Sequence, residues 1–432
     1  MKAFLCKVKT GGIFLLLLVL ANAAPLSAQP TFSGYVKFFA YPNLNAPFLL
    51  DRYGSRLQLA VTHQTGSRAN FYAAFNFDLE ENRATGLADE PRSAITEIYP
   101  VEVYVDLHWE KVDLRLGKQF VFWGRTDWVN PTDNITPWDF QNITAEIEDY
   151  RLSVGAAKLD AYLGEWTVEA VVVPFFKPNR IAIEFPDTLG GIPVLQPPPR
   201  LPDSRLKNWQ FGLRADSYAA GFDFSFSYWQ GFDLFPSVHV GIVPGPGLFP
   251  AALVFQQRFH RIRVAGMDFA RSINRLTVKG EAAYFATEDR SGTDVFIKNP
   301  HLQVVLGLDY TLSDRLSANV QYVQETLFKY SRRDEIERRR RMGDPDPDVD
   351  RENTYSASAR IQYKAADYWD FQLIGVVNFA DWDAFLLPIL RYDFADGINI
   401  YLGAALFTGP ADSPFGRNRK FSRAFFDVKY SF

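Results

Sequence analysis

The sequence predicts an all-β fold: one closed, antiparallel, up-and-down β-barrel of about 18 strands, with about 16–18 as the range. Three observations predict it. Apolar and polar residues alternate along most of the 432 residues. The segments with this alternation are joined by short connections and, between these, mostly by long ones. The chain ends on an alternating segment whose last residue is Phe432.

The composition excludes several other classes of protein. Charged residues make up 22% and hydrophobic residues 47%, so the chain is neither disordered nor a coiled coil. Aromatic residues reach 16%, well above ordinary usage. The net charge of −4 gives no electrostatic footprint for nucleic acid. The single cysteine, Cys6, has no partner for an internal disulfide.

Residues 1–28 are predicted to be a secretory signal peptide. Lys2, Lys7 and Lys9 give the segment a positive start. Residues 13–20 then form an apolar run that is too short to cross a bilayer. Small residues follow, with cleavage expected after Ala28 or after Ala23. The mature barrel, residues 29–432, then has 43 basic and 50 acidic residues, which is a net charge of −7.

The strands are predicted from the alternation, because successive side chains of a strand point to opposite faces. In residues 101–109, Val, Leu and Trp take one face, while Glu102, Asp106 and His108 take the other. Residues 112–116 repeat the pattern after a two-residue turn, which predicts a hairpin. In residues 255–271 the pattern shifts its parity, so we expect a bulge or a misplaced strand start there. In all, strands are predicted to begin near residues 31, 52, 68, 100, 111, 151, 165, 208, 220, 255, 276, 300, 315, 353, 368, 384, 397 and 420.

The connections fall into two classes. Those after even-numbered strands are short, as around Gly66 and Gly164. Those after odd-numbered strands are mostly long, as in residues 124–150 and 177–207, although one near 380–383 is short. An outer-membrane barrel has short periplasmic turns and long extracellular loops, whereas a soluble β-sandwich has no reason for this asymmetry. Alternation alone does not separate these two folds, and the loop lengths favour the bacterial outer membrane.

The last ten residues support the same prediction. Phe432, Tyr430 and Val428 lie on one face of the terminal segment, and Asp427 and Lys429 lie on the other. This pattern resembles the terminal strand of Gram-negative outer-membrane barrels, which end in Phe and are inserted by the barrel assembly machinery. The resemblance implies that Phe432, Tyr430 and Val428 act as the assembly signal.

The third long loop, residues 124–150, is the candidate functional segment. In trimeric porins the third loop folds into the barrel and narrows the pore, and this loop is similar in position and length. Its polar side chains offer hydrogen bonds, and its tryptophans offer flat faces suited to a sugar. The alternative is structural, with the tryptophans packing the loop or joining the aromatic girdle. The candidate pore residues in and before this loop are Arg115, Gln119, Trp123, Arg125, Asp127, Asn130, Asp133 and Asp139.

The stretch LRLGKQFVFWGRTDWVNPTD, which starts at Leu114, resembles a pattern of porin-like barrel families. These families include alginate-export-like proteins and uncharacterised relatives. Lys118 stands where these families often have Arg. The resemblance implies a role in transport and leaves the solute open. The predicted lumen charges are mixed, so strong anion or cation selectivity is not readable from the sequence. An arginine ladder across neighbouring strands is likewise not visible in a sequence.

Residues 329–352 contain eight basic and eight acidic residues, and a solvated extracellular loop is the favoured interpretation. Its basic half suits lipopolysaccharide phosphates. The alternating acids Asp344, Asp346, Asp348 and Asp350 resemble a calcium loop, but no glycine stands where an EF-hand needs one.

The favoured function is a porin-like channel for diffusion or facilitated transport of small solutes. The alternative is a transporter of hydrophobic solutes, lipids or polysaccharide, and an adhesin or scaffold needs no site. An enzyme is not expected, because His108 near Asp106 has no serine nucleophile motif beside it. No cofactor, metal ion or nucleic acid is expected. The expected partners are outer-membrane lipids, lipopolysaccharide, the barrel assembly machinery and a small solute, and the oligomeric state stays open.

Overall fold

The computed structural model describes residues 29–432 except 46–49, 83–92, 182, 184, 246–249 and 342–348. The predicted signal peptide lies outside the described residues. So do three of the four alternating acids of the loop at 329–352, namely Asp344, Asp346 and Asp348.

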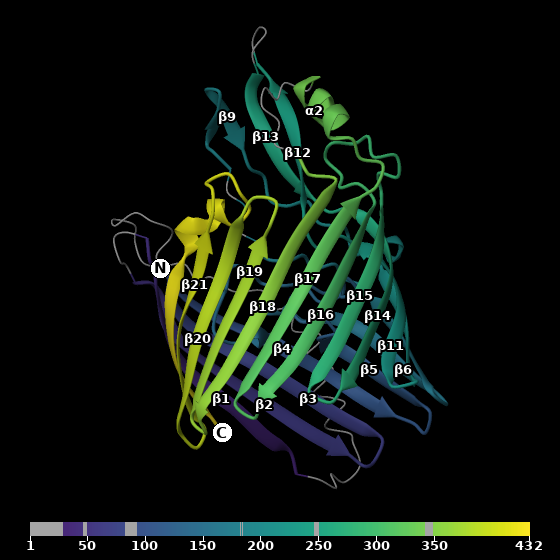
Figure 1. Ribbon diagram of the computed structural model, residues 1–432, viewed down its shortest axis with the longest axis vertical. Coiled ribbons are helices and arrows are strands. Elements are labelled where there is room, and N and C mark those ends of the chain that lie inside the picture. The colour runs from purple at the N-terminus through teal and green to yellow at the C-terminus, as the bar shows by residue number, and fades with distance from the viewer. Residues whose placement is uncertain are drawn as a thin grey trace, which may run out of the picture.

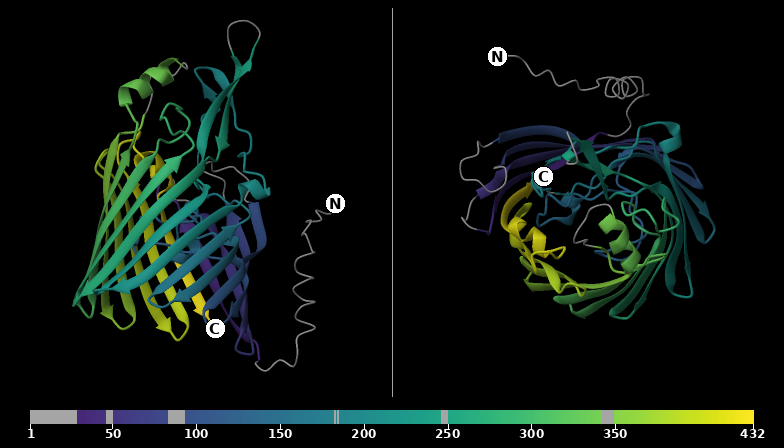
Figure 2. Two further views of the ribbon diagram at one scale, coloured as in Figure 1. Left: turned by 90° about the vertical axis from the view of Figure 1, so that its right-hand side faces the viewer. Right: turned by 90° about the horizontal axis from the view of Figure 1, so that it is seen from above.

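Eighteen strands form one closed antiparallel sheet, which confirms the predicted barrel (Figures 1 and 2). Each strand pairs with the next barrel strand along the chain, and the last pairs with the first. The barrel strands are β1 (Thr31–Pro42), β2 (Leu50–Thr65), β3 (Ala69–Asn82), β4 (Ser93–His108), β5 (Val112–Gln119), β6 (Val154–Leu163), β7 (Trp166–Val173), β10 (Gln210–Ala219), β11 (Phe222–Phe232), β14 (Arg261–Ile273), β15 (Leu276–Thr287), β16 (His301–Ser313), β17 (Leu316–Leu327), β18 (Asn353–Ala366), β19 (Trp369–Asn378), β20 (Asp383–Ala395), β21 (Ile398–Thr408) and β22 (Arg423–Ser431).

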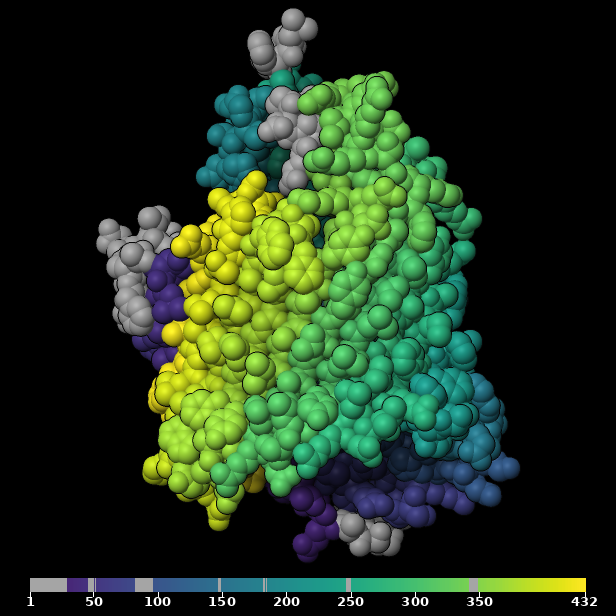
Figure 3. All heavy atoms as spheres, viewed as in Figure 1, coloured from purple at the N-terminus to yellow at the C-terminus, as the bar shows by residue number. Residues whose placement is uncertain are grey.

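The two faces of the barrel wall differ in polarity. On β17, Val320 and Tyr322 are 53% and 39% exposed on the outside, whereas Asn319 and Gln321 point inward and are 6% and 0% exposed. The outer surface is continuous over β15 to β20 (Figure 3). Closure leaves every barrel strand paired on both sides, which the lipid interior requires. A closed sheet with an apolar exterior places the protein in the bacterial outer membrane.

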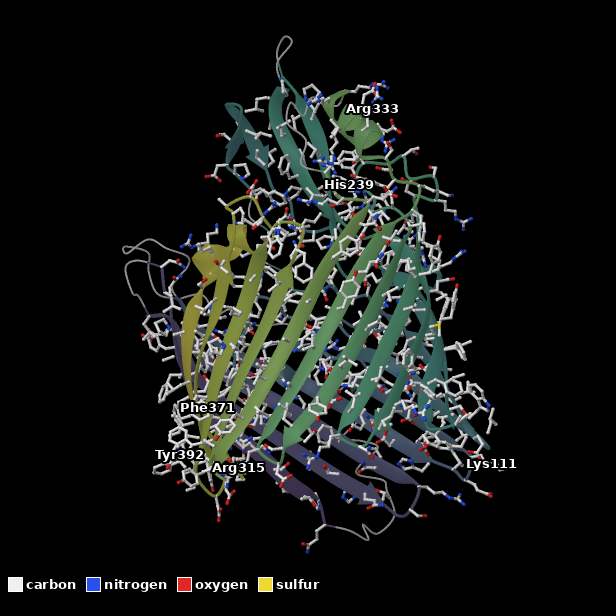
Figure 4. The ribbon with its side chains drawn as sticks, viewed as in Figure 1. Lys111, His239, Arg315, Arg333, Phe371 and Tyr392 are labelled. Carbon is white, nitrogen blue, oxygen red and sulfur yellow. The ribbon has the colours of Figure 1, made fainter. Side chains whose placement is uncertain are left out.

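The short and long connections lie at opposite ends, as predicted. All eight connections after even-numbered barrel strands are short turns, such as the two-residue turn between β10 and β11. Lys111 and Arg315, in two of these turns, lie at the lower end of the barrel in Figure 4, and Arg333 and His239 lie at the upper end. The lower end is therefore periplasmic and the upper end extracellular. Aromatic rings line the lower rim outside, where Trp369 stacks on Tyr392 with 4.3 Å between ring centroids.

The predicted strand near residue 255 is misplaced. Residues 250–258 form β13 (Pro250–Arg258), which belongs to a separate four-stranded sheet above the barrel, and the barrel strand β14 begins at Arg261. The parity shift marks this junction, because the chain leaves one sheet and enters the other. The other strands of the upper sheet are β8 (Thr188–Leu189), β9 (Ile192–Leu195) and β12 (Ser237–Pro244).

Short helices occupy several loops. Helix α2 (Arg332–Arg341) replaces part of the predicted solvated loop, and Glu335 in its first turn pairs with Arg339 at 2.9 Å. An acidic first turn and a basic last turn both favour a helix. Single 3₁₀ turns are η1 (Ile147–Tyr150), η2 (Leu206–Asn208) and η3 (Gly416–Phe421). No helix in the described part of the chain is long and apolar enough to cross a membrane.

The C-terminal strand closes the barrel. Tyr430 pairs with Val36 of β1 and with Ile398 of β21, and Val428 pairs with Phe38. The backbones of Phe432 and Gly34 exchange two hydrogen bonds of 3.0 Å. The placement agrees with the predicted apolar terminal face. The assembly role of Phe432, Tyr430 and Val428 stays a prediction.

Candidate functional site

The connection between β5 and β6, residues 120–153, enters the barrel. Near its start, the guanidinium of Arg125 forms ion pairs with Asp268 on β14 and with Asp216 on β10, the latter at 3.2 Å. The backbone N–H of Arg125 donates to Glu281 of β15 at 2.7 Å. The acceptors all lie on the inward faces of their strands, so this part of the loop rests on the inner wall.

Asp127 extends the same contact to the next strands. Its carboxylate lies 3.2 Å from the ammonium of Lys279 on β15. It also accepts a hydrogen bond of 2.8 Å from Asn319 and one of 3.3 Å from Gln321, both on β17. The side chain is about one-third exposed, so Asp127 keeps access to solvent.

The end of the loop contacts the opposite wall. Glu146 lies 3.3 Å from Lys37 of β1 and 2.5 Å from Lys429 of β22. Asp149 pairs with Lys37 and, at 3.1 Å, with Arg56 of β2. Burial alone would raise the pKa of Asp149, but Lys37 and Arg56 hold it down at about 2. In the closed sheet these strands lie across the barrel from β10, β14, β15 and β17, so the loop spans the lumen.

Apolar side chains pack the loop against the wall on both sides. Trp123 is buried, its indole N–H donates to Glu169 at 2.5 Å, and its ring meets Trp229 edge-on. Near the far wall, Trp128 and Ile143 pack against a buried cluster on β1 and β19 to β22. The predicted packing role of the tryptophans therefore holds for Trp123 and Trp128. This packing holds the loop against the wall.

Several candidate residues stabilise the loop or the wall. Gln119 is fully buried and donates to the carbonyl of Ala156 at 3.0 Å. Asn130 donates to the carbonyl of Thr126 at 3.0 Å. Arg115 lies on β5 and pairs with Asp106 at 2.6 Å.

Asp133 lies buried in the same loop. Its carboxylate is 2.7 Å from Arg151. Burial raises the pKa of Asp133 to about 6, although Arg151 opposes the shift. A carboxylate in this position is a packing partner of Arg151 and does not face an open passage.

A cavity of about 1010 Å³ separates the loop from the wall formed by β1 to β5 and by β18 to β22. Ten basic and seven acidic residues line it. Of the eight candidate pore residues, Asp139 is among its lining residues; its carboxylate lies 3.2 Å from Arg180 and accepts from Asn142 at 2.7 Å. Arg360 on β18 and Arg391 on β20 also line the cavity, and Gln372 lines it from β19 between them.

Sequence reasoning missed the residues that hold the loop and line this cavity. Lys37 and Arg56 carry a detectable signal, because each is a charge at an inward position of a predicted strand. Glu146 and Asp149 carry none, since nothing in a loop sequence says which wall it will meet. Lys177 also lies in a long connection, and only the fold brings it to the cavity.

Comparison with known proteins agrees with the fold. OpdK of Pseudomonas aeruginosa, solved with vanillate, is 10% identical, with a TM-score of 0.55 over 94% of this chain and 98% of that chain. OccAB4 of Acinetobacter baumannii is 11% identical, with a TM-score of 0.54. The match covers 95% of this chain and 100% of OccAB4. At these identities the likeness concerns the fold alone.

Sequence comparison gives the family. No curated protein sequence matches the chain. The profile of the family described as "Protein of unknown function (DUF1302)" matches residues 60–373, which is more than half of the chain. The chain therefore belongs to the DUF1302 family.

Proposed function

We propose that the protein is an outer-membrane channel for small polar solutes and that residues 120–153 narrow its lumen. The observation that carries the proposal is the double attachment of this loop. Arg125 and Asp127 bind the wall at β10 to β17, and Asp149 binds the wall at β1 and β2. A loop tied at both sides of a barrel leaves a passage only beside it, and the 1010 Å³ cavity is that passage.

The charges around the cavity favour a polar solute over a hydrophobic one. Seventeen of its lining residues are ionisable acids or bases, and moving a lipid past them would strip water from charges without replacing it. OpdK, a structural neighbour, was solved with vanillate, which supports a small organic molecule as the cargo. A transporter of lipids or polysaccharide is the less favoured candidate, and no chemical reaction is proposed.

The test is conductance and solute flux through the purified barrel. Folded protein, identified by different gel migration before and after boiling, is reconstituted in planar bilayers and in liposomes. We expect stepwise ion conductance, and liposome swelling with sugars, amino acids or organic acids that decreases as solute size increases. Folded protein that inserts but neither conducts ions nor passes any of these solutes would refute the channel.

A further inference from the structure

Two ammonium groups at the cavity, those of Lys118 and Lys177, form no ion pair with any of the described residues. Lys118 on β5 donates to the carbonyl of Pro100, and Lys177, which follows β7, donates to the carbonyl of Ser153 at 3.2 Å. Among the described residues, no carboxylate lies within 4 Å of either ammonium. Both side chains are half-buried, and both line the cavity. Each ammonium has three donors, so both retain donors for a ligand.

The carboxylates of the same wall are already occupied. Glu102 accepts from the backbone N–H of Phe120 at 2.9 Å. Asp139 accepts from Asn142 and pairs with Arg180, whose side chain is 56% exposed. Lys118, Lys177 and Arg180 thus face two carboxylates, each of which already accepts a hydrogen bond, and the local charge is positive. A buried cation without a counter-charge is costly, so this cluster favours an anion.

Aromatic rings adjoin the cluster. Phe120 lies two residues after Lys118, so both side chains lie on one face of the chain, and both line the cavity. Tyr99 precedes Pro100, the residue that receives the Lys118 hydrogen bond, and it also lines the cavity. Flat apolar faces beside cationic donors suit a molecule with a ring and an acidic group.

We propose that Lys118, Lys177 and Arg180 form a binding site for small organic anions that carry an aromatic ring. The inference rests on the proposed channel function, because it names the class of solute for that cavity. The anionic group lies between the two ammoniums and the guanidinium, and the ring lies against Phe120 and Tyr99. Charge-assisted hydrogen bonds supply the selectivity for an acid over its amide.

The protonation behaviour of Lys177 agrees with this placement. Burial, together with the nearby cations Lys118 and Arg180, lowers the pKa of Lys177 to about 8, although Asp139 opposes the shift. An anion bound between these cations replaces their mutual repulsion with attraction. The site is therefore pre-formed for a negative charge.

The test is direct binding of three probes by equilibrium dialysis of the purified barrel in detergent. Benzoate carries ring and charge, acetate carries charge alone, and benzamide carries the ring alone. We expect benzoate to bind more tightly than both. Lys118→Gln and Lys177→Gln should each weaken benzoate binding about tenfold, the usual effect of one charged hydrogen bond. Lys111→Gln, in a periplasmic turn (Figure 4), is the control and should leave binding unchanged.

The outcomes separate the site from the channel. Equal binding of benzoate and benzamide, no benzoate binding, or equal benzoate affinity in the Lys118→Gln/Lys177→Gln variant would each overturn the anion site. Benzoate binding with the expected pattern, in a barrel that does not conduct, would keep the site and reject the channel. Acetate binding as tight as benzoate binding would reject the role of the ring. Heat-dependent gel migration checks that each variant is folded.

Discussion

Replacing Asp149 with Asn should release the end of the inward loop from the wall. The carboxylate of Asp149 is 14% exposed and faces Lys37 and, at 3.1 Å, Arg56. Asparagine keeps the size of the side chain and removes its charge. Lys37 and Arg56 then lose this partner, although Lys37 keeps Glu146 at 3.3 Å and Arg56 keeps Asp78 at 2.7 Å.

The size of the effect follows from the pKa and from the burial. Lowering the pKa of Asp149 from 3.8 to about 2 corresponds to about 2 kcal/mol of favourable interaction with the ionised form. The substitution leaves neither cation uncompensated, because Lys37 keeps Glu146 and Arg56 keeps Asp78, so the expected cost stays at about 2 kcal/mol. The ratio of attached to detached loop should therefore fall by a factor of about 30. This stabilisation is fully present above about pH 4 and is lost only as the pH falls through about 2.

The assay is single-channel recording of the wild type and of Asp149→Asn in planar bilayers. We expect a larger mean conductance and added current fluctuations in the variant, since a detached loop obstructs the lumen less and moves. A shift of the reversal potential alone would reflect the lost charge and not loop release. The control is Asp203→Asn, which removes an exposed carboxylate that pairs with Arg205 outside the barrel. Unchanged conductance and noise in folded Asp149→Asn would refute the attachment of the loop by this residue.

Four further predictions test the barrel, its closure and its charges. The protein should resist SDS until boiled, because all barrel strands are paired; identical migration of boiled and unboiled samples would contradict this. Deleting Phe432 removes the two backbone hydrogen bonds with Gly34, so outer-membrane levels on immunoblots should fall, and normal levels would argue against an assembly role. Arg125→Gln should shift salt-gradient reversal potentials toward cations, and Asp127→Asn toward anions, because each removes one charge from the inner side of the barrel; no shift in either would place the loop outside the ion path. Benzoate binding should weaken as the pH rises through about 8, where Lys177 loses its proton, and Lys177→Arg should keep binding at higher pH; a wild-type affinity that is constant from pH 7 to pH 9 would contradict this.

The fold was predictable from the sequence to a large extent because period-two alternation reports the strands directly. The predicted starts at 31, 276 and 353 coincide with those of β1, β15 and β18. The exception at residue 255 arose because β13 and β14 are both strands, and alternation does not tell which sheet a strand joins. Helix α2 was not predicted because its stripe of arginines has no apolar periodicity.

The candidate site was predictable only in part. The position of the third loop was enough to expect an inward fold, and Arg125 and Asp127 do contact inward-facing residues of the wall. Trp123 and Asp133 belong to the same loop and were candidates on the same grounds, yet the structure buries both of them. Residue type does not separate a buried charge with a partner from a charge beside water, because the partner lies far away in the chain.

Under the proposed channel function, the inward loop gives a lumen with mixed charges a way to select solutes by charge. On the β10 to β15 side, the loop covers the acidic residues, since Arg125 is paired with both Asp216 and Asp268. On the other side, Glu146 and Asp149 satisfy Lys37 and Arg56 but leave Lys118 and Lys177 without acidic partners within 4 Å among the described residues. Acidic and basic residues are nearly balanced along the chain, but the loop neutralises them unequally in space. In the proposed channel, the charge that a solute meets is therefore set by which side the loop leaves open, and that side has ten basic and seven acidic lining residues.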